Sequence, residues 1–497
     1  MKISSTFANL VLCAVGLLSV AHTQEARSLQ KRSTSLLINP PGLPQLPTAN
    51  AAKAASASAG LNLTDIQGDI VVGMTKKQET FTFFTIVDAP TFKSKLRSEI
   101  LPLITNARQM LKNETQPDTL VNIAFSQNGL TTLGITDNLN DTAFKNGQLN
   151  NSQALGDPVG TPDWLPEFTA GNIHGVFLFA SDTVDNVNAT LETVTSALGA
   201  SITQVYSLQA AVRPGNEAGH EHFGFLDGIS NPAIQGFDDT PLPGQASVPA
   251  GEILLGEQND NVIRPDWAKD GSFLVFRQLQ QLVPEFNKYL TDNPIREPAL
   301  TPEQGSELLG ARMVGRWKSG APVFLSPLVD NPALGANSSA NNDFTYAAPN
   351  NASLCPFSAH IRKTRPRADL GAESKNTHHI LRGGIPYGPE VTTAEASSNT
   401  STIERGLAFV AYQSNIGAGF QFLQQTWANN PNFFVKGTTG FDPIIGANHG
   451  NPRWTEGNLD PTIPTRNFTI ITDFIVSRGG EYFFSPSLSA IANKISV

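Results

Sequence analysis

The sequence predicts an α+β protein built from two ferredoxin-like domains. Each half of the 497-residue chain shows the order strand, helix, strands, helix, strand, which is the succession of a ferredoxin-like unit. A Pro/Gly-rich region at residues 232–270 separates the halves. Hydrophobic residues make up 40% of the chain and charged residues 15%, which is ample apolar material for two cores.

The first half opens with a β-rich run between glycines, residues 65–73. Its first clear strand leads into apolar residues at helical spacing, and Asp182 suits the N-cap of a later helix. The expected elements are strands at residues 80–87, 121–125, 175–180 and 202–212, and helices at residues 92–104, just after Ser126 and at residues 184–198.

The second half repeats this style. Thr301 and Gln304 have the spacing of a capping box, which predicts the start of a helix. The expected elements are strands at residues 272–279 and 406–412, and helices at residues 282–290, 303–314 and 419–427.

The first residues predict export. Lys2 gives a positive start, residues 7–20 are mainly apolar, and small residues around Ala21 suit signal cleavage. An N-terminal membrane anchor is less favoured, because nothing follows that would stop transfer. The dibasic pair Lys31-Arg32 suits a processing protease. We therefore expect a signal peptide at residues 1–21, a pro-segment or flexible arm at residues 22–60, and domains at residues 61–250 and 251–497.

Charge and sequons fit a secreted protein. The chain carries a formal charge of −9, and residues 1–60 contribute +4, so the processed chain would carry −13. Such acidity disfavours nucleic acid and membranes as partners. Cys355 is the one cysteine after the signal, so no intramolecular disulfide can form. Sequons for N-glycosylation occur at Asn62, Asn113, Asn140, Asn150, Asn188, Asn337, Asn351, Asn399 and Asn467.

Residues suited to chemistry gather in four segments, each of which also has an ordinary explanation. Asp227-Gly228 suits a turn, and the alternating His220 and His222 could form half of a metal site. Ser353 can cap a short helix with His360 at its middle, where a core histidine would also fit. The usual motifs of zinc hydrolases, serine hydrolases and P-loop enzymes do not occur. The segments are residues 219–230, 353–366, 378–389 and 405–416.

Taken together, these segments resemble the fungal dye-decolorizing peroxidases. Gly224-Phe225-Leu226-Asp227-Gly228 matches the Gly-x-x-Asp-Gly motif of that family. Residues 355–367 look like its proximal-histidine helix and residues 381–390 like its distal-arginine segment. Further similarity lies at residues 66–74, 271–278 and 406–422. One departure is Gly383, where fungal members usually carry a second arginine.

The resemblance implies a fold of the dimeric α+β barrel type with haem b in the C-terminal domain. His360 would bind the iron, and Asp227 and Arg382 would act on hydrogen peroxide. A peroxide reaction needs a base that moves a proton between the two oxygens, which an ionised Asp227 can do. Arg382 would keep Asp227 ionised and stabilise the leaving oxygen. A carboxylate base works where a distal histidine would be protonated, which predicts an acidic optimum.

Other residues have supporting roles under the same resemblance. Asp442 is the candidate carboxylate behind His360, although it also suits a turn before proline. Arg362 could meet a haem propionate or be a solvated helix charge. Leu407 and Phe409, alternating on one strand, would wall the pocket.

Bulky dyes cannot reach a buried iron, and the family uses surface aromatic residues as electron relays. Tyr387 and Trp427 match such positions, and either could equally be an ordinary surface aromatic residue. The predicted protein is thus a secreted peroxidase that oxidises dyes and phenolic compounds through high-valent iron. The alternatives are a haem carrier without turnover, and a secreted glycosidase that pairs Glu221 with Asp227 or Asp238.

Overall fold

The computed structural model describes residues 36–111, 116–347, 351–371, 377–433, 439–455 and 459–497. The predicted signal peptide, the Lys31-Arg32 pair and the Asn113 sequon lie outside this part of the chain. Within it, no helix has the length and apolar character needed to cross a membrane.

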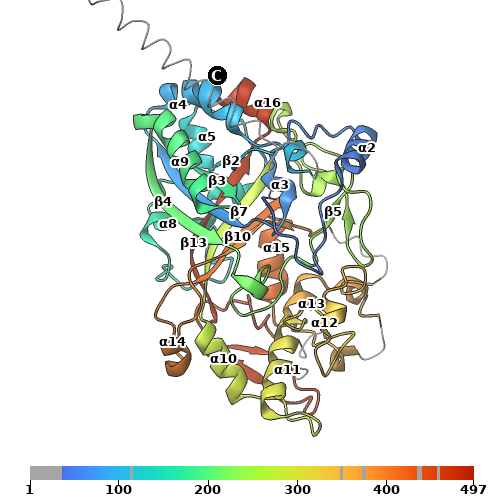
Figure 1. Ribbon diagram of the computed structural model, residues 1–497. Helices are drawn as coiled ribbons and strands as arrows, with labels where there is room; N and C mark the ends of the chain where they lie inside the picture. Colours follow the sequence, from blue (N-terminus) through green and yellow to red (C-terminus); the bar gives the residue numbers. More distant parts are fainter. Residues whose placement is uncertain (1–35, 112–115, 348–350, 372–376, 434–438, 456–458) are drawn as a thin grey trace, which may run out of the picture.

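The first ferredoxin-like unit agrees closely with the predicted elements. Its strands lie in the order β2-β3-β1-β4, with every neighbouring pair antiparallel. Helices α4, α5 and α9 gather at one end of the molecule (Figure 1). The elements are β1 (Gln78–Ile86), α4 (Ala89–Lys95), β2 (Leu120–Phe125), α5 (Gln127–Thr132), β3 (Gly175–Ser181), α9 (Val184–Leu198) and β4 (Ile202–Ala211).

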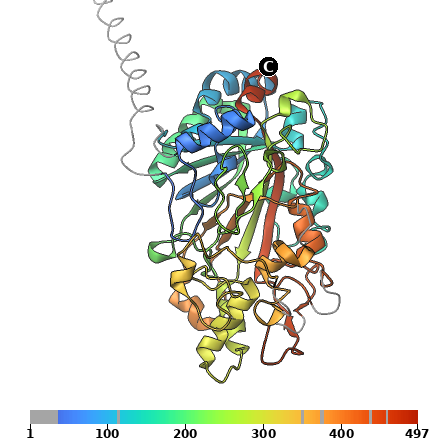
Figure 2. The ribbon, with the colours of Figure 1, turned by 90° about the vertical axis from the view of Figure 1, so that its right-hand side faces the viewer.

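The second unit has the equivalent strand order, β13-β7-β10, with β8 and β9 in succession along the far side of β10. Figure 2 shows β13, in red, beside β7, in yellow-green. The elements are β7 (Ser272–Gln281), α10 (Val283–Asp292), α11 (Pro302–Val314), α13 (His360–Thr364), β8 (Leu381–Arg382), β9 (Ile385–Tyr387), β10 (Gly406–Gln413), α15 (Phe420–Phe422), η10 (Leu423–Ala428) and β13 (Ile475–Ser485).

The two units close into one barrel. Strand β13 meets β2 where Phe484 pairs with Phe125, and β4 meets β9 where Ala210 pairs with Tyr387. Aromatic residues fill the interior, where the ring centroids of Phe83 and Phe276 lie 4.9 Å apart. The predicted α+β fold of the dimeric barrel type is confirmed, with both ferredoxin-like units in a single chain.

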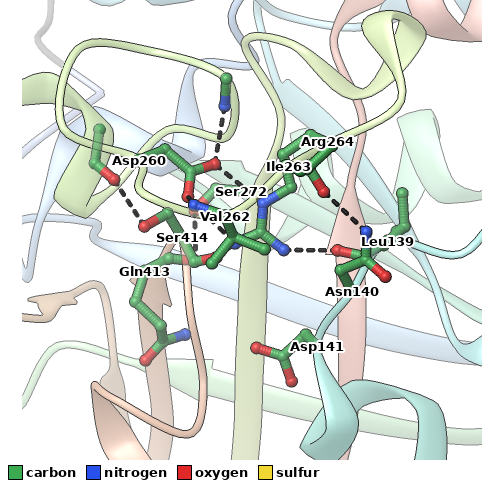
Figure 3. Close-up of polar contacts among 12 residues, drawn as sticks. Leu139, Asn140, Asp141, Asp260, Val262, Ile263, Arg264, Ser272, Gln413 and Ser414 are labelled. Carbon is green, nitrogen blue, oxygen red and sulfur yellow. Dashed lines mark hydrogen bonds and ion pairs between the residues drawn. The ribbon is translucent and has the colours of Figure 1, made fainter.

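A buried arginine ties the connecting loop to both units (Figure 3). Nε of Arg264 donates to Oδ2 of Asp260 at 2.8 Å. Its Nη groups donate to the carbonyl oxygens of Leu139, in the first unit, and of Ser414, just after β10 in the second, the latter at 2.6 Å. The loop between the units therefore has fixed contacts on both sides.

Three local predictions were wrong. Residues Asp69–Val72 form the short helix α3 rather than a strand, because a short apolar run fits either periodicity and all four residues are buried. The predicted helix around His360 starts at His360 itself, after the N-cap Ala359. Thr183, not Asp182, caps α9. The capping box of Thr301 and Gln304 is confirmed at the start of α11.

The described end of the predicted arm, residues 36–60, packs against the barrel. Leu36 and Leu43 are buried, and α2 (Ala49–Ala59) buries Ala52 in the core. Whether these residues belong to a removable pro-segment stays a prediction. The remaining elements are α6 (Thr142–Asn146), α7 (Gln148–Asn151), α8 (Pro166–Thr169), β5 (Ala233–Ile234), β6 (Ser247–Val248), α12 (Pro332–Gly335), α14 (Thr393–Ser398), β11 (Arg453–Thr455), β12 (Phe468–Ile470) and α16 (Leu488–Ala490).

Candidate active site

A cavity of about 470 Å³ lies on the outer face of the second unit's sheet. Side chains alternate along β7, so that Phe276 fills the barrel while Arg277 and Leu279 face the cavity. Their partners on β10 are Phe409 and Leu407, which line it as well. The two predicted wall residues therefore belong to one apolar surface.

His360 lies in this cavity at the first position of α13. Its Nδ1 is 2.9 Å from Oδ2 of Asp442, and the other carboxylate oxygen of Asp442 accepts from the backbone N–H groups of Ile444 and Ile445 at 2.8 and 3.0 Å. Burial lowers the pKa of His360, but the charge and hydrogen bond of Asp442, together with the charge of Asp227, outweigh it and the pKa ends above its usual value. This carboxylate keeps the proton on Nδ1 and leaves Nε2 for a ligand.

Asp227 and Arg382 also line the cavity and form an ion pair through Nη1 of Arg382 and Oδ1 of Asp227. The backbone N–H of Gly228 donates to the same oxygen at 2.7 Å. Burial would raise the pKa of Asp227, but the charge and hydrogen bond of Arg382 bring it below its usual value. Asp227 is therefore an ionised carboxylate at mildly acidic pH.

Asn231 was not predicted, yet it holds these two segments together. Its Nδ2 donates to the carbonyl oxygen of Arg382 at 2.9 Å, and its Oδ1 accepts from the backbone N–H of Arg382 at 3.2 Å. An asparagine four residues after Asp227, in a loop, gives no sequence signal for such a contact. It fixes the register of β8 against the loop that carries Asp227.

Family models match both units. A model described as the DyP dimeric alpha+beta barrel domain covers residues 65–214, and one described as the Dyp-type peroxidase C-terminal domain covers residues 220–433. The chain belongs to the dye-decolorizing peroxidase family.

Curated relatives and solved structures agree with this assignment. Dye-decolorizing peroxidase msp1 of Mycetinis scorodonius is 56% identical over 96% of each chain. Dye-decolorizing peroxidase AauDyP1 of Auricularia auricula-judae is 53% identical over 94% of this chain and 92% of its own. The crystal structure of a fungal DyP-type peroxidase from the latter species has a TM-score of 0.85 at 53% identity, over 88% of this chain and 99% of its own.

Members of the dye-decolorizing peroxidase family are haem enzymes, and the cavity fits that group. Its walls are largely apolar, and Nε2 of His360 would be a suitable ligand for the haem iron. Arg316 and Arg365 line it too, and burial lowers their pKa values to about 9 and about 10. Both Nη groups of Arg316 already donate to protein oxygens, those of Gly320, Asn341, Ser230 and Asn342. Arg365 is therefore the cation better suited to a haem propionate.

Arg362, by contrast, does not line the peroxidase cavity. Its guanidinium donates to both carboxylate oxygens of Asp369 at 2.7 Å and to the carbonyl oxygen of Cys355 at 2.5 Å. The rings of Tyr346 and Phe357 lie 4.5 and 4.3 Å from it. The expected propionate contact is wrong because a residue two positions past His360 points to the other side of the helix.

The predicted relay residues of this peroxidase are buried rather than on the surface. Tyr387 is 5% exposed and donates from its hydroxyl to Glu404 at 3.0 Å. Trp427 is 3% exposed and lies edge-on to His378 at 5.5 Å between ring centroids. Because His378 lines the cavity, it separates Trp427 from the site. Their surface placement was therefore wrong, and their role as relays stays a proposal.

Proposed function

We propose that this chain is a secreted haem b peroxidase that reduces hydrogen peroxide and oxidises aromatic dyes and phenolic compounds. The observation that carries the proposal is that one cavity holds both an Asp227–Arg382 ion pair and a histidine whose Nδ1 is held by Asp442. The Asp227–Arg382 ion pair suits proton transfer between the two oxygens of peroxide. A histidine whose Nδ1 is held by a carboxylate suits an iron ligand.

A bound haem would supply the iron that accepts peroxide and stores the oxidising equivalents. His360 would hold it through Nε2, and Arg365 would meet a propionate. Asp442 keeps the imidazole proton partly withdrawn, which makes His360 a stronger electron donor.

Asp227 then serves as the proton carrier. As an ionised carboxylate it takes a proton from one oxygen of hydrogen peroxide and returns it to the other, which leaves as water. Arg382 holds Asp227 ionised and stabilises the negative charge that develops on the departing oxygen. Leu407 and Phe409 exclude water from this step.

Substrates too large for the cavity would deliver electrons through buried aromatic side chains. The ring of Trp427 contacts that of His378, which lines the cavity. The hydroxyl of Tyr387 donates to the carboxylate of Glu404, which could accept its proton on oxidation. These contacts support the two predicted relays despite their burial.

Secretion and glycosylation are supported by where the sequons lie. Seven of the sequon asparagines are exposed, as an acceptor for a glycan must be: Asn62, Asn140, Asn150, Asn188, Asn337, Asn399 and Asn467.

The glycosidase alternative has little support from the site. Glu221 accepts from the backbone N–H groups of Phe223 and Phe225 and from Gln281, so both its oxygens are occupied. Asp238 lies against a different, smaller cavity. A Soret band in the purified protein tests this directly, since a glycosidase has no haem. A carrier without turnover would show the band but no spectral change with hydrogen peroxide.

A further inference from the structure

Residues 36–47, here called the strap, follow the barrel surface beside the loop that carries Asp227. The strap begins with an antiparallel bridge between Leu37 and Lys76. The backbone N–H of Ile38 donates to the carbonyl oxygen of Thr75 at 2.7 Å. Its outer side faces solvent, since Asn39 and Pro41 are exposed. The strap is thus a covering layer rather than part of either unit.

The strap packs directly on the Asp227 loop. Leu43 is 2% exposed and forms a small apolar cluster with Leu226 and Ile229, which flank Asp227. Nδ2 of Asn341 donates to the carbonyl oxygen of Gly42 at 2.9 Å, which holds this part of the strap in place. One leucine side chain therefore bridges the strap and the segment that positions the proton carrier.

Two small cavities lie between the strap and the site. One, of about 20 Å³, has walls that include Ile38 and Asp227. The other, of about 60 Å³, is lined by residues 43–47 together with Gly228 and Asn231. The cavity of about 20 Å³ has room for about one water molecule, and a slight widening of its walls would admit a molecule of hydrogen peroxide. A dye could not enter either.

We propose that hydrogen peroxide reaches Asp227 beneath the strap, and that the strap keeps the unprocessed chain in a slow-reacting form. The inference rests on the proposed peroxidase function. It adds the path by which hydrogen peroxide enters and a means of keeping the unprocessed chain slow to react. Removal of residues up to 60 would uncover both small cavities. Residues 57–60, the last turn of α2 and its C-cap Gly60, are exposed and accessible to a protease. Proteolysis would thus open the route for the small oxidant without changing the site's own residues.

The test compares full-length, haem-loaded variants in stopped-flow reactions with hydrogen peroxide. Leu43→Gln should weaken the strap and raise the second-order rate constant about tenfold, the change that corresponds to ~1.4 kcal/mol of lost contact. Ile38→Ala, which widens the smaller cavity, should raise it as well, and it serves if Leu43→Gln does not fold. Asn50→Ala, on an exposed position of α2, is the matched control and should leave the rate unchanged.

Hydrogen exchange gives a readout that does not depend on turnover. In Leu43→Gln, amides of residues 219–229 should exchange faster than in the unmodified chain, while those of β1 should not change. Equal peroxide rates in Leu43→Gln, Ile38→Ala and the control would overturn the proposed route. A chain that binds no haem or never reacts with peroxide contradicts the peroxidase function instead. In that case, unchanged amide hydrogen exchange at residues 219–229 in Leu43→Gln would still show that the strap does not stabilise the loop that carries Asp227.

Discussion

At the scale of single residues, the site divides its work between two carboxylates in different settings. Asp442 is buried behind His360. Burial raises its pKa, but the charge and hydrogen bond of His360 and the two backbone N–H donors together bring the pKa below the usual value. Asp227 has a permanent cation, Arg382, as its partner. In the proposed function the first carboxylate would tune the iron ligand without meeting peroxide, whereas the second would be available to move a proton. Their roles follow from their partners.

Arg382→Leu should shift the acid limit of activity to higher pH. The native pKa of Asp227 is depressed by Arg382, so the carboxylate stays ionised to low pH. Without that charge its pKa rises, and activity is lost earlier as pH falls. Peroxide reaction rates measured from pH 3 to 8 check this. An unchanged acid limb, with only a lower plateau, would mean that Arg382 acts on the leaving oxygen alone.

Trp427→Phe and Tyr387→Phe together should slow the oxidation of bulky dyes and leave small reductants and the peroxide step unchanged. Both side chains are buried, so the substitutions remove a redox-active group while keeping an aromatic ring in place. Steady-state rates for a bulky and a small reductant provide the comparison. If dye turnover is unaffected, electrons leave by a different path.

At the scale of elements, long periodic segments were predicted well and short ones were not. The helix expected at residues 184–198 is α9 with the same bounds, because its apolar spacing continues over four turns. Helix α13 has only five residues, so its start is decided by contacts rather than propensity. The expected contact of Arg362 with a propionate failed for a separate reason, because Arg362 points away from the cavity and pairs with Asp369. The motif nevertheless pointed to His360, which lines the cavity, since the chemistry of a single residue does not depend on the helix start.

Arg362 and Arg365 should therefore respond differently to substitution. Arg362→Leu leaves the partly buried Asp369 without its ion partner and should lower the free energy of unfolding by about 3 kcal/mol. Arg365→Leu removes a cavity-lining cation and should weaken haem retention with a smaller effect on the apoprotein. Urea denaturation and haem release to apomyoglobin measure the two effects. Equal haem release from both variants would contradict the assignment of propionate contacts to Arg365.

At the scale of the whole molecule, the pattern of elements predicted two units but not how they meet. Each unit repeats its own strand order, which local periodicity can reveal. The seams rest on single pairings such as Phe484 with Phe125, which are far apart in sequence and leave no periodic signal. Because the strands of both units belong to one continuous sheet, the point along the chain where one unit ends does not correspond to a separation between two domains in space. The division at residue 250 remains a prediction.

The closed barrel should unfold as one cooperative structure. Phe484→Ala removes a side chain that is fully buried at the seam, and we expect a loss of about 3–5 kcal/mol. Tryptophan fluorescence reports on several regions and far-ultraviolet circular dichroism on the whole fold. Their transitions should coincide in the wild type and shift together in the variant. Separate transitions would show that the units are stable independently.

We infer that Asp227 carries the proton for peroxide in a haem site held by His360. Stopped-flow absorption of the haem-loaded chain and of Asp227→Asn, mixed with hydrogen peroxide, tests it most directly. Both proteins should show the same Soret band at rest, because Asp227 does not hold the haem. The variant should react with peroxide about 10²–10⁴-fold more slowly, the usual effect of losing a positioned general base. A variant that retains its haem and reacts as fast as the wild type would contradict the account.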